Sequence, residues 1–506
     1  MICLSRLAGQ MNLKIAGSGD PEIIGITEDS REVKPGWLFA AVKGVKYDGR
    51  DYVNDAVAKG AAAVMITGAD MELSVPRLIV PHEDIRPVMA GAAAAIYGRP
   101  SDKLIMVGIT GTNGKTTTAY LMEEILTRAG LLPGVMGTIN FRWPGEVRPA
   151  PNTTPEGPVL SANLAAMLEA GAKSAVLEVS SHALALGRVV GLGFDVALFS
   201  NLTREHLDFH QDMEDYYQSK KLLFLKYLRP GDKKAVINID DPYGARLAEE
   251  LGPAAITFGF SEKAEVRGSD LKLGRDGLSL TITCGNESWT QTSPLLAEVN
   301  GYNILGAAAL ALAMHVDRKT ISEALAASKG APGRLEKVGA NSDYLVLVDY
   351  SHGPDALDKA LEACRALEPK RLLVVFGCGG DRDRGKRPIM GRLAGEKADL
   401  TVITSDNPRT EEPWSIMLEV EAGLGGLNLS KYEPGELASD DWGAGSRLMI
   451  VDRRAAIKEA VRLMEPGDIL LIAGKGHEDY QIIGREKRTL DDRVEALEAL
   501  KKLGRD

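Results

Sequence analysis

The chain has 506 residues, enough for about three domains of roughly 100–200 residues each. Its composition, 44% hydrophobic and 26% charged, is that of a globular protein, and its net charge of −10 disfavours a general nucleic-acid binder, which needs a broad basic surface. The four cysteines lack CxxC spacing, which disfavours a zinc knuckle or a disulfide framework and fits a reducing compartment.

The first residues, MICLSRLAGQMNLKIAG, lack the long apolar run of a signal peptide. No stretch of the chain approaches the ~18 apolar residues of a membrane span. We therefore expect a cytoplasmic protein without membrane attachment.

Short apolar strands and small helices alternate in the N-terminal part of the chain. The predicted elements are strands at 37–44, 61–68 and 76–81 and helices at 53–60 and 88–97. The last helix stops at the Gly98-Arg99-Pro100 break, which predicts the first domain boundary.

A second alternation starts at Lys103 with a strand, a glycine-rich turn and a helix. Its predicted elements are strands at 103–110, 175–180, 196–201 and 235–240 and a helix at 116–130. The segment 278–284 has the pattern of a strand in an antiparallel insertion. The Gly/Pro cluster at 329–333 predicts the second boundary. Beyond it, strands are predicted at 344–350, 371–377, 400–406, 447–452 and 469–474, again alternating with helices.

The whole pattern predicts an α/β protein of three domains. We place a smaller α/β domain at 1–99, a central P-loop-type domain with a mostly parallel sheet at 100–332, and a Rossmann-like domain at 333–506.

The turn from Gly111 to Thr116, GTNGKT, joins a strand to a helix. Glycines let backbone amides approach phosphate oxygens, the helix N-terminus adds a positive dipole, Lys115 adds charge, and the hydroxyl of Thr116 can hold Mg²⁺. An ordinary glycine-rich turn with a chance lysine is the alternative, which the strand–GKT–helix context disfavours. The loop is shorter than the general Walker form, since Ile109 stands where its first glycine would be.

Polar side chains also follow two other predicted strands. Glu178 ends one of them, and at the carboxyl end of a parallel strand it would face the ligand crevice. His206, Asp208 and His210 lie in one short loop after another strand. A zinc pair is the rival interpretation, but no third ligand is nearby and the glutamate of an HExxH motif is missing. Taken alone, each histidine could equally be a hydrogen-bonded structural residue.

Seven motifs occur in the same order as in the Mur ligases, and together they cover nearly the whole chain. They are GTNGKTTT, NTTPE, LEVSSHAL, NLTREHLDFH, YYQSKKLLF, DYSHGPDAL and GKGHEDYQ. The chain therefore resembles the Mur ligases, which implies an ATP-dependent ligase of bacterial peptidoglycan synthesis. The short phosphate loop also resembles that of folylpolyglutamate synthetases, a more distant alternative.

The resemblance implies Mg²⁺ as cofactor, served by Thr116, Glu178 and His206. It also places Lys220 at the position of a lysine that is carbamylated (N6-carboxylated) in this family, so that a cation becomes an anion that organises metal or phosphate. Taken alone, Lys220 beside Lys221 would be an ordinary solvated helix residue.

ATP is the implied co-substrate, with its adenine and ribose held outside the phosphate loop. The residues implied to bind it are Gly111, Thr112, Asn113, Gly114, Lys115, Thr116, Thr117, Asn303, Arg334 and Asp349. Ser351 and Gly353 depart from the usual DYAHTPD wording of the last motif but leave Asp349, His352 and Asp355 in place.

Two arginines, Arg382 and Arg409, lie in loops after apolar strands of the last domain. An arginine fork can bind the distal carboxylate of diaminopimelate bidentately, and Glu478 could take its distal ammonium. The tetrapeptide DNPR resembles that of the diaminopimelate-adding members of the family, whereas lysine-adding members usually lack the arginine. The residues implied to bind meso-diaminopimelate are Arg382, Asp406, Asn407, Pro408, Arg409, Gly474 and Glu478. A surface salt-bridge network is the alternative for any one of these charges.

The segment EDSREVKPGWLFAAVKG resembles the uridine-diphosphate-binding stretch of the same enzymes, with Ser30 and Lys43-Gly44 near the nucleotide. The residues implied to contact the muramoyl peptide are Asn152, Thr153, Thr154, Ser180 and Arg188. Leu186 stands where relatives often carry glutamine, which weakens that contact.

Together these residues imply a ligase that joins meso-diaminopimelate to UDP-N-acetylmuramoyl-L-alanyl-D-glutamate. ATP would phosphorylate the side-chain carboxylate of the D-glutamyl residue, and the amine of diaminopimelate would attack the acyl phosphate. The implied catalytic residues are Lys115, Lys220 and His352, with His352 or a neighbouring carboxylate as candidate base. The expected partners are these small molecules alone, and the expected state is a monomer.

Two kinds of alternative stay open. A ligase that adds lysine or D-alanyl-D-alanine is the nearest one. A nucleotide-switched binding protein without catalysis belongs to another class, and the His, Glu and Lys residues around the phosphate loop disfavour it.

Overall fold

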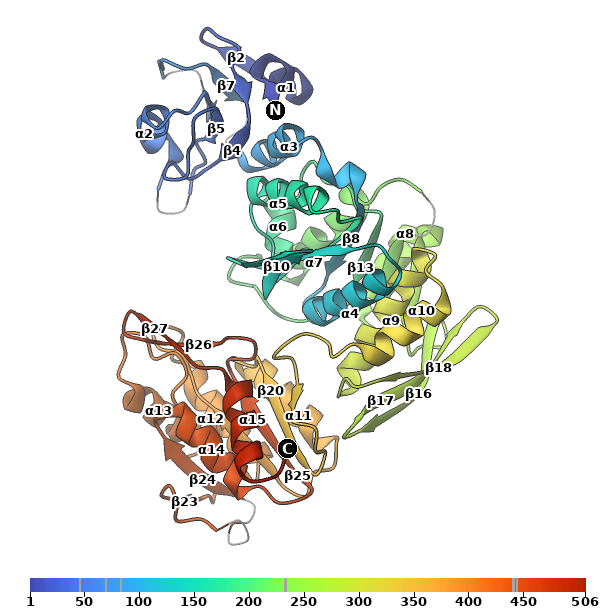
Figure 1. Cartoon of the computed structure of the whole chain (residues 1–506), viewed down its shortest axis with the longest axis vertical. Coiled ribbons are helices and arrows are strands. Elements are labelled where there is room, and N and C mark those ends of the chain that lie inside the picture. Colours follow the sequence, from blue (N-terminus) through green and yellow to red (C-terminus); the bar gives the residue numbers. More distant parts are fainter. Residues whose placement is uncertain (45–46, 69–70, 82–83, 232–233, 439–441, 443–444) are drawn as a thin grey trace. The chain divides into compact units, whose positions relative to one another are not determined.

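The computed structural model describes the chain except for residues 45–46, 69–70, 82–83, 232–233, 439–441 and 443–444 (Figure 1). The described chain forms two compact units. The first consists of Met1–Gly268, Ile282–Trp289 and Tyr302–Leu325, and the second of Ser269–Thr281, Thr290–Gly301 and Ala326–Asp506. In the described part of the chain, no helix is long and apolar enough to cross a membrane.

The first unit begins with a small five-stranded sheet in the order β2-β7-β6-β5-β4, parallel from β4 to β7. Its strands are β2 (Lys14–Ala16), β4 (Gly25–Thr27), β5 (Trp37–Ala40), β6 (Ala63–Thr67) and β7 (Arg77–Val80), while β1 (Ile2–Cys3) pairs with β3 (Glu22–Ile23). Successive residues of a strand face opposite ways. Leu38 therefore packs with α1 (Leu4–Met11) and α3 (Arg86–Ile96), and Phe39 with α2 (Val53–Ala58).

A larger sheet follows, in the order β11-β10-β9-β12-β8-β13-β14-β15-β16-β17-β18, with β9 to β16 parallel in that order. Its strands are β8 (Ile105–Thr110), β9 (Pro133–Met136), β10 (Asn140–Trp143), β11 (Glu146–Pro149), β12 (Ser174–Glu178), β13 (Val196–Phe199), β14 (Ala235–Asn238), β15 (Ala255–Gly259), β16 (Val266–Gly274), β17 (Gly277–Cys284) and β18 (Glu287–Ser293). Because β8 lies between β12 and β13, the three loops that follow these strands meet at one edge of the sheet.

Helices cover this sheet, and a short π-helical turn, Leu223–Tyr227, follows one of them. They are α4 (Lys115–Arg128), α5 (Gly157–Glu169), α6 (Ser181–Ala185), α7 (Met213–Leu222), α8 (Pro242–Leu251), α9 (Glu298–Ala313) and α10 (Arg318–Ala327). Leu160 and Leu164 of α5 and Tyr216 of α7 join the buried cluster formed with the central strands.

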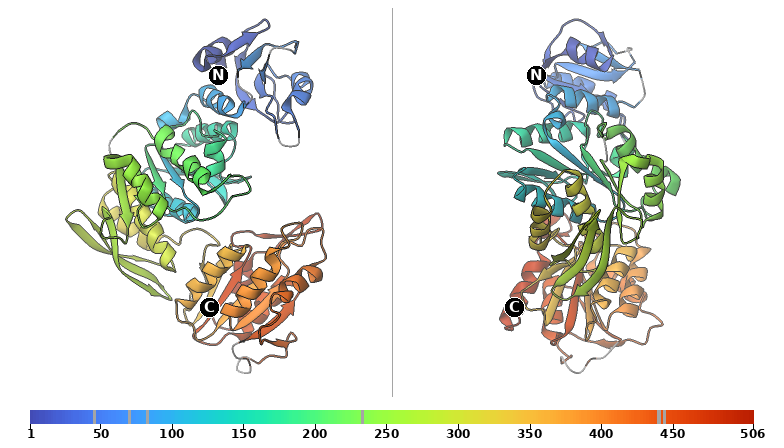
Figure 2. Two further views of the ribbon diagram at one scale, coloured as in Figure 1. Left: turned by 180° about the vertical axis from the view of Figure 1, so that it is seen from behind. Right: turned by 90° about the vertical axis from the view of Figure 1, so that its right-hand side faces the viewer.

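The second unit contains a sheet in the order β19-β20-β25-β21-β22-β24-β23, parallel except for β19 (Figures 1 and 2). Its strands are β19 (Glu336–Val338), β20 (Tyr344–Asp349), β21 (Leu372–Phe376), β22 (Leu400–Thr404), β23 (Ser430–Tyr432), β24 (Ser446–Ile450) and β25 (Asp468–Ala473). Leu347 faces a layer formed by α11 (Pro354–Arg365), α12 (Lys386–Lys397) and α13 (Pro413–Ala422), and Val348 faces α14 (Arg453–Leu463) and α15 (Asp492–Lys502). A hairpin, β26 (Tyr480–Ile483) and β27 (Glu486–Thr489), completes the unit.

The strands and helices named in the sequence analysis are confirmed, and so is the α/β class. The segment 278–284 forms β17, which Arg275 and Asp276 alone connect to β16, and a link this short requires antiparallel strands. The sequence analysis missed the short strands β2, β4 and β23 and the hairpins β10–β11 and β26–β27, whose apolar patterns are too brief to stand out.

Candidate functional site

The phosphate-loop residues form a tight turn between β8 and α4. Gly111 and Gly114 have φ angles of 144° and 87°, which side-chain-bearing residues rarely adopt. The Nζ atom of Lys115 donates to the carbonyl oxygens of Gly111 and Thr112, each at 2.8 Å. The loop is therefore compact, and Lys115 folds back over it.

A buried carboxylate lies directly against this loop. Glu178, at the end of β12, is 2% exposed and accepts a hydrogen bond from Thr116 Oγ1 at 2.9 Å. It also accepts from the backbone N–H of Thr138 at 3.0 Å and from the Thr138 hydroxyl at 2.9 Å. Thr138 was not singled out from the sequence, because it follows a strand, β9, that shows no motif.

These oxygen atoms are the hard ligands that Mg²⁺ prefers. Within the described ranges, no three or more His, Cys, Asp or Glu side chains are grouped so that they could hold a metal ion. A hydroxyl and one carboxylate suit a Mg²⁺ ion that takes its remaining ligands from substrate phosphates and water, which is the usual arrangement at phosphoryl-transfer sites.

Lys220 is a buried lysine beside the same loop. Its side chain, on α7, is 1% exposed, and Nζ donates to the carbonyl oxygen of Gly111 at 2.8 Å. The Nζ atom also lies 4.7 Å from the ring centre of Tyr216, whose hydroxyl contacts Thr112 Oγ1 at 3.1 Å. Burial first, and the charge of Lys115 second, lower the pKa of Lys220 well below its ordinary value.

Three histidines gather next to Lys220. The ring of His182 lies 4.9 Å from that of His206 and stacks on Phe209 at 4.0 Å. Burial lowers the pKa of His182 to about 4 and also lowers that of His206, so both rings are neutral at pH 7. The two ring nitrogens of His210 contact Ser181 Oγ at 2.9 Å and Asp215 Oδ2 at 3.2 Å. His210 is thus already engaged at both nitrogens, which disfavours the zinc-pair interpretation.

The residues expected at the muramoyl peptide form one connected group. Thr154 Oγ1 donates to the carbonyl oxygen of Glu178 at 2.8 Å and accepts from the backbone N–H of Ser180 at 2.9 Å. Arg188 donates to the Thr154 carbonyl oxygen at 2.9 Å and pairs with Glu156 at 2.7 Å. Three further positions of the sequence analysis lie around them: Thr153 Oγ1 contacts Thr138 Oγ1 at 3.1 Å, Asn152 is exposed, and Leu186 ends α6.

Ser30 lines a pocket of about 660 Å³, and so does Gly44. Glu28, Arg86 and Glu156 also line it, none of which the sequence analysis singled out. Arg86 donates to the carbonyl oxygen of Lys43 at 3.1 Å, and burial, followed by the charge of Glu156, raises the pKa of Glu28 to about 7. The pocket therefore combines an arginine with a carboxyl group that is partly protonated at neutral pH.

The residues predicted to bind diaminopimelate, the amine that accepts the acyl group, form a second group in the second unit; we call it the acceptor group. Asn407 Nδ2 donates to Glu478 Oε2 at 3.0 Å, and Arg409 Nη1 donates to the carbonyl oxygen of Gly380 at 2.7 Å. A Cβ atom placed on Gly379 would lie 3.0 Å from Arg409 Nη1 and 3.8 Å from Arg382 Cγ, so both arginines flank this glycine. In the same group, Pro408 is buried, and a Cβ atom on Gly474 would lie 3.9 Å from Asp406 Cγ.

The remaining predicted residues lie in separate places. Asn303, in the first unit, contacts Thr118 Oγ1 through Oδ1 at 3.5 Å. In the second unit, Arg334 lies 5.1 Å over the Tyr350 ring, and Asp349 is buried, with Oδ2 accepting from the backbone N–H of Leu335 at 2.8 Å. Burial raises the pKa of Asp349, against the effect of Arg334. His352 is exposed, with Nδ1 at 2.9 Å from the Tyr350 carbonyl oxygen.

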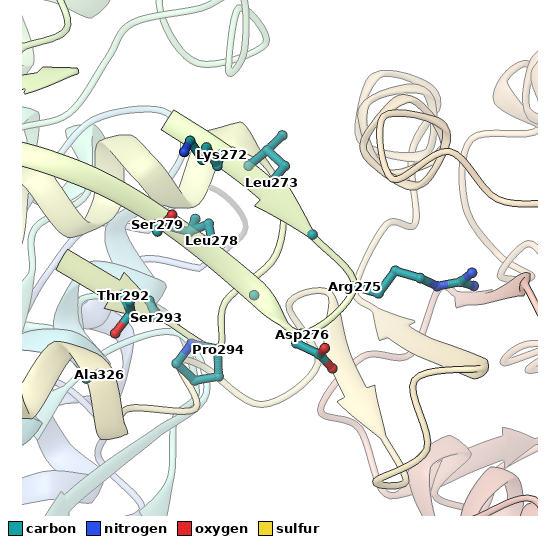
Figure 3. Close-up of a pocket in the computed structure, with 12 residues that line it drawn as sticks. Lys272, Leu273, Arg275, Asp276, Leu278, Ser279, Thr292, Ser293, Pro294 and Ala326 are labelled. Carbon is teal, nitrogen blue, oxygen red and sulfur yellow. The ribbon is translucent and has the colours of Figure 1, made fainter. Parts of the chain in front are cut away.

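Another pocket, of about 550 Å³, lies at the tip of the β16–β17 hairpin (Figure 3). At this tip Arg275 donates to the carbonyl oxygens of Gly467 and Asp468 at 3.0 and 2.6 Å, all within the second unit. Asp276 pairs with Lys337 at 3.4 Å. The pocket contains none of the predicted site residues, and its walls serve to attach the hairpin.

Three family models match successive parts of the chain. They are described as "Mur ligase family, catalytic domain" at residues 22–97, "Mur ligase middle domain" at 109–311 and "Mur ligase, glutamate ligase domain" at 333–476.

Relatives and solved structures agree with these matches. The chain is 45% identical over 96% of its length to the UDP-N-acetylmuramoyl-L-alanyl-D-glutamate--2,6-diaminopimelate ligase of Geobacter metallireducens, of which it also covers 96%, and 43% identical over 99% to that of Gloeobacter violaceus, of which it covers 98%. A solved structure of a ligase of the same name is 32% identical with a TM-score of 0.69, each chain being covered to 95%. The MurF ligase of Thermotoga maritima in complex with ADP, at 19% identity and a TM-score of 0.59 over 94% of this chain and 97% of its own, shares the fold. On this identity and coverage, the chain belongs to the Mur ligase family.

Proposed function

We propose that this protein uses ATP to join meso-diaminopimelate to UDP-N-acetylmuramoyl-L-alanyl-D-glutamate in peptidoglycan synthesis. The observation that carries the acceptor assignment is the group formed by Asn407, Arg409 and Glu478, in which an arginine and a carboxylate stand on adjoining loops. A relative with 45% identity bears the name of this activity. An amino acid with a carboxylate and an ammonium at its distal end matches such a pair of charges.

In this proposal the parts of the chain that contain the three larger sheets bind different substrates. Residues 1–99 and the pocket around Ser30 receive the uridine nucleotide, residues 100–332 hold the phosphates of ATP and the muramoyl peptide, and residues 333–506 hold the amino acid. We further propose that the protein acts as a monomer in the cytoplasm and needs no nucleic acid or membrane partner.

The reaction begins with transfer of the γ-phosphoryl group of ATP to the side-chain carboxylate of the D-glutamyl residue. The phosphate loop, with its backbone amides and Lys115, holds the transferred group, and Thr154, Ser180 and Arg188 hold the peptide. The amine of diaminopimelate then attacks the acyl carbon and loses a proton, and phosphate leaves as the amide forms. His352 is the candidate for accepting that proton, because it is exposed and its Nδ1 donates to the Tyr350 carbonyl oxygen, so that Nε2 is the nitrogen of the unprotonated ring that can accept a proton.

Thr116, Glu178 and His206 are the residues that would hold Mg²⁺, which neutralises phosphate charge when bound. Asn303, Arg334 and Asp349 would hold the adenosine part of ATP. Lys220 would act as its carbamate: a neutral amine adds to CO₂, forms an N–C bond and releases one proton. The dry environment that lowers the pKa of Lys220 supports this step, because it leaves the amine unprotonated.

Phosphate release tests the proposal. With ATP and the muramoyl dipeptide, we expect turnover with meso-diaminopimelate and little with L-lysine, because lysine would leave Arg409 without its carboxylate partner, at a cost of about 1–3 kcal/mol or more. Arg409→Lys keeps the charge but loses the fork, so it is expected to raise the KM for diaminopimelate. Turnover with lysine instead would keep the family and overturn the acceptor assignment.

The carbamate has its own test. Lys220→Ala is expected to lose activity, and short carboxylic acids added to this variant are expected to restore part of it by replacing the anion. Depletion of CO₂ should lower the activity of the unaltered protein and bicarbonate should restore it. Full activity of Lys220→Ala would exclude the carbamate.

A further inference from the structure

The acceptor group of the second unit contains a buried cation that lies between its carboxylates. Lys475, in the loop after β25, has a side chain that is 0% exposed. Its Nζ atom lies 3.3 Å from Asp406 Oδ1 and 3.5 Å from Glu478 Oε2. The sequence analysis quoted the motif GKGHEDYQ that contains Lys475 but gave roles only to Gly474 and Glu478.

The same ammonium also makes hydrogen bonds to two different segments. It donates to Asn407 Oδ1 at 3.1 Å and to the carbonyl oxygen of Tyr480 at 2.5 Å. Asn407 Oδ1 accepts in addition from the backbone N–H of Ile482 at 2.9 Å, and Gln481 Nε2 donates to the carbonyl oxygen of Asp406 at 2.6 Å. Lys475 therefore joins the loop after β22, the loop after β25 and strand β26.

The charges of this group are close to balance. Asp406 and Glu478 are two carboxylates and Lys475 is one cation, so the three leave one negative charge. Arg453, the next buried cation, already forms an ion pair with Asp492 at 2.7 Å. Removal of Lys475 would leave these two carboxylates close together without the cation between them, which is unfavourable for two like charges in a poorly hydrated site.

We propose that Lys475 is a positioning residue for the amino-acid substrate: it orients Asp406, Asn407 and Glu478, and together with the two carboxylates it carries one net negative charge, which matches a single ammonium at the distal end of the substrate. This inference rests on the proposed function. It assigns a role in specificity to a residue that does not contact the substrate and acts through the side chains it orients.

Lys475→Met is the direct test, since methionine keeps an unbranched side chain one atom shorter than that of lysine and removes the charge. We expect the KM for meso-diaminopimelate to rise by about 10- to 100-fold, the range that corresponds to the loss of a buried charged partner. Formation of the acyl phosphate from ATP and the muramoyl dipeptide, measured without amino acid, should stay within about twofold, because Lys475 belongs to the second compact unit and the phosphate loop to the first.

Lys487→Met is the matched control. Lys487 is exposed, on β27 of the same hairpin, and lies 3.6 Å over the Tyr480 ring. It loses the same charge near the same tyrosine but touches neither carboxylate, so its KM should be unchanged. An equal rise of KM in both variants would overturn the proposal, since general loss of positive charge would then explain the effect.

A charge-restoring variant separates charge balance from simple tethering and guards against a Lys475→Met variant that fails to fold. Lys475→Met combined with Asp406→Asn again leaves one negative charge and no unpaired buried acid. We expect it to fold and to bind diaminopimelate at least about fivefold better than Lys475→Met, a coupling of about 1 kcal/mol. Where Lys475→Met does not fold, the comparison is with Asp406→Asn alone, whose KM should then be the higher one.

The outcomes are distinct. A double variant no better than either single variant, or an unchanged KM in Lys475→Met, overturns the role of Lys475. Absence of phosphate release by the unaltered protein with every amino acid overturns the proposed function itself.

Discussion

Arg409 combines a functional side chain with a backbone conformation that is unfavourable for it. Its φ angle is 53°, in the left-handed region, which costs a residue with a side chain about 1–2 kcal/mol. Two backbone hydrogen bonds offset the cost: Arg409 N–H to the Ile482 carbonyl oxygen at 3.1 Å and Gly484 N–H to the Arg409 carbonyl oxygen at 2.7 Å. The hairpin β26–β27 thus holds the backbone of Arg409 and with it the direction in which the Arg409 side chain projects.

Replacing Arg409 by glycine or by alanine separates the backbone from the side chain. Both variants lose the guanidinium, so both should raise the KM for diaminopimelate. Only alanine keeps the left-handed strain, so we expect Arg409→Ala to be less stable than Arg409→Gly by about 1 kcal/mol in urea unfolding. Equal stability of the two variants would show that the strain is relieved elsewhere.

At this scale the sequence predicts the residues within motifs but misses their partners. Thr116 and Glu178 were named together, yet Thr138, which holds Glu178 from 40 positions away, carries no local signal. Lys475 is another such partner to which the sequence analysis gave no role. A lysine in a sequence is ordinarily exposed, and only the fold shows that it is fully buried between two acids.

The turn at the tip of the hairpin β16–β17 attaches this hairpin to the rest of the second unit. Arg275 and Asp276 form the whole connection between these strands, and each binds residues of the second unit: carbonyl oxygens for Arg275, Lys337 and Ser342 for Asp276. The pKa of Asp276 is lowered by its bonds to Ser342 and Lys337, as expected for an ionised acceptor.

Arg275→Ala removes two charge-assisted hydrogen bonds from this tip. We expect the free energy of unfolding to fall by about 1–3 kcal/mol in urea denaturation, because the two carbonyl oxygens lose a charged donor. Lys272→Ala, at an exposed position of the same hairpin, should change stability by less than about 0.5 kcal/mol. Similar losses in both variants would indicate that the hairpin itself, and not its attachment, is weakened.

Elements were predicted well where burial is continuous. Strands such as β21, apolar along its whole length, and β25, apolar after Asp468, were found because such runs are typical of buried parallel strands. The hairpin β26–β27 was missed because β27 is fully exposed and reads Glu-Lys-Arg-Thr, without any apolar alternation. That hairpin nevertheless holds Arg409 in place.

Across the molecule, each compact unit contains a histidine that resists protonation. Burial is the main cause of the lowered pKa, about 4, of both His182 in the first unit and His477 in the second. The positive charge of Arg334 adds to the effect at His477. In the unfolded chain both would titrate near pH 6.5.

The sign of the pH effect follows from these values. Between pH 6.5 and about 4 the unfolded chain binds protons that the folded chain does not, so stability is lost as the pH falls through this range. We expect urea midpoints to fall over this interval, and His477→Gln to make the decline shallower. A decline of unchanged steepness in His477→Gln would mean that carboxylates alone cause it.

The alternation of strands and helices predicts three domains, and each restart of the pattern after a Gly/Pro break coincides with a new sheet, while the described chain forms two compact units. The sequence does not reveal that Ser269–Thr281 and Thr290–Gly301 belong to the compact unit of the C-terminal sheet. Such membership depends on side chains, such as Arg275, that find partners far along the chain.

The geometry of Gly111 limits how this protein can change over generations. A Cβ atom there would lie 1.9 Å from Ser200 Oγ, and the φ angle of 144° is nearly closed to other residues even if Ser200 were smaller. A compound that binds the backbone of this turn would therefore bind a surface that a substitution of Gly111 can hardly change without disrupting the turn. Heritable escape from such an inhibitor would have to arise elsewhere in the molecule.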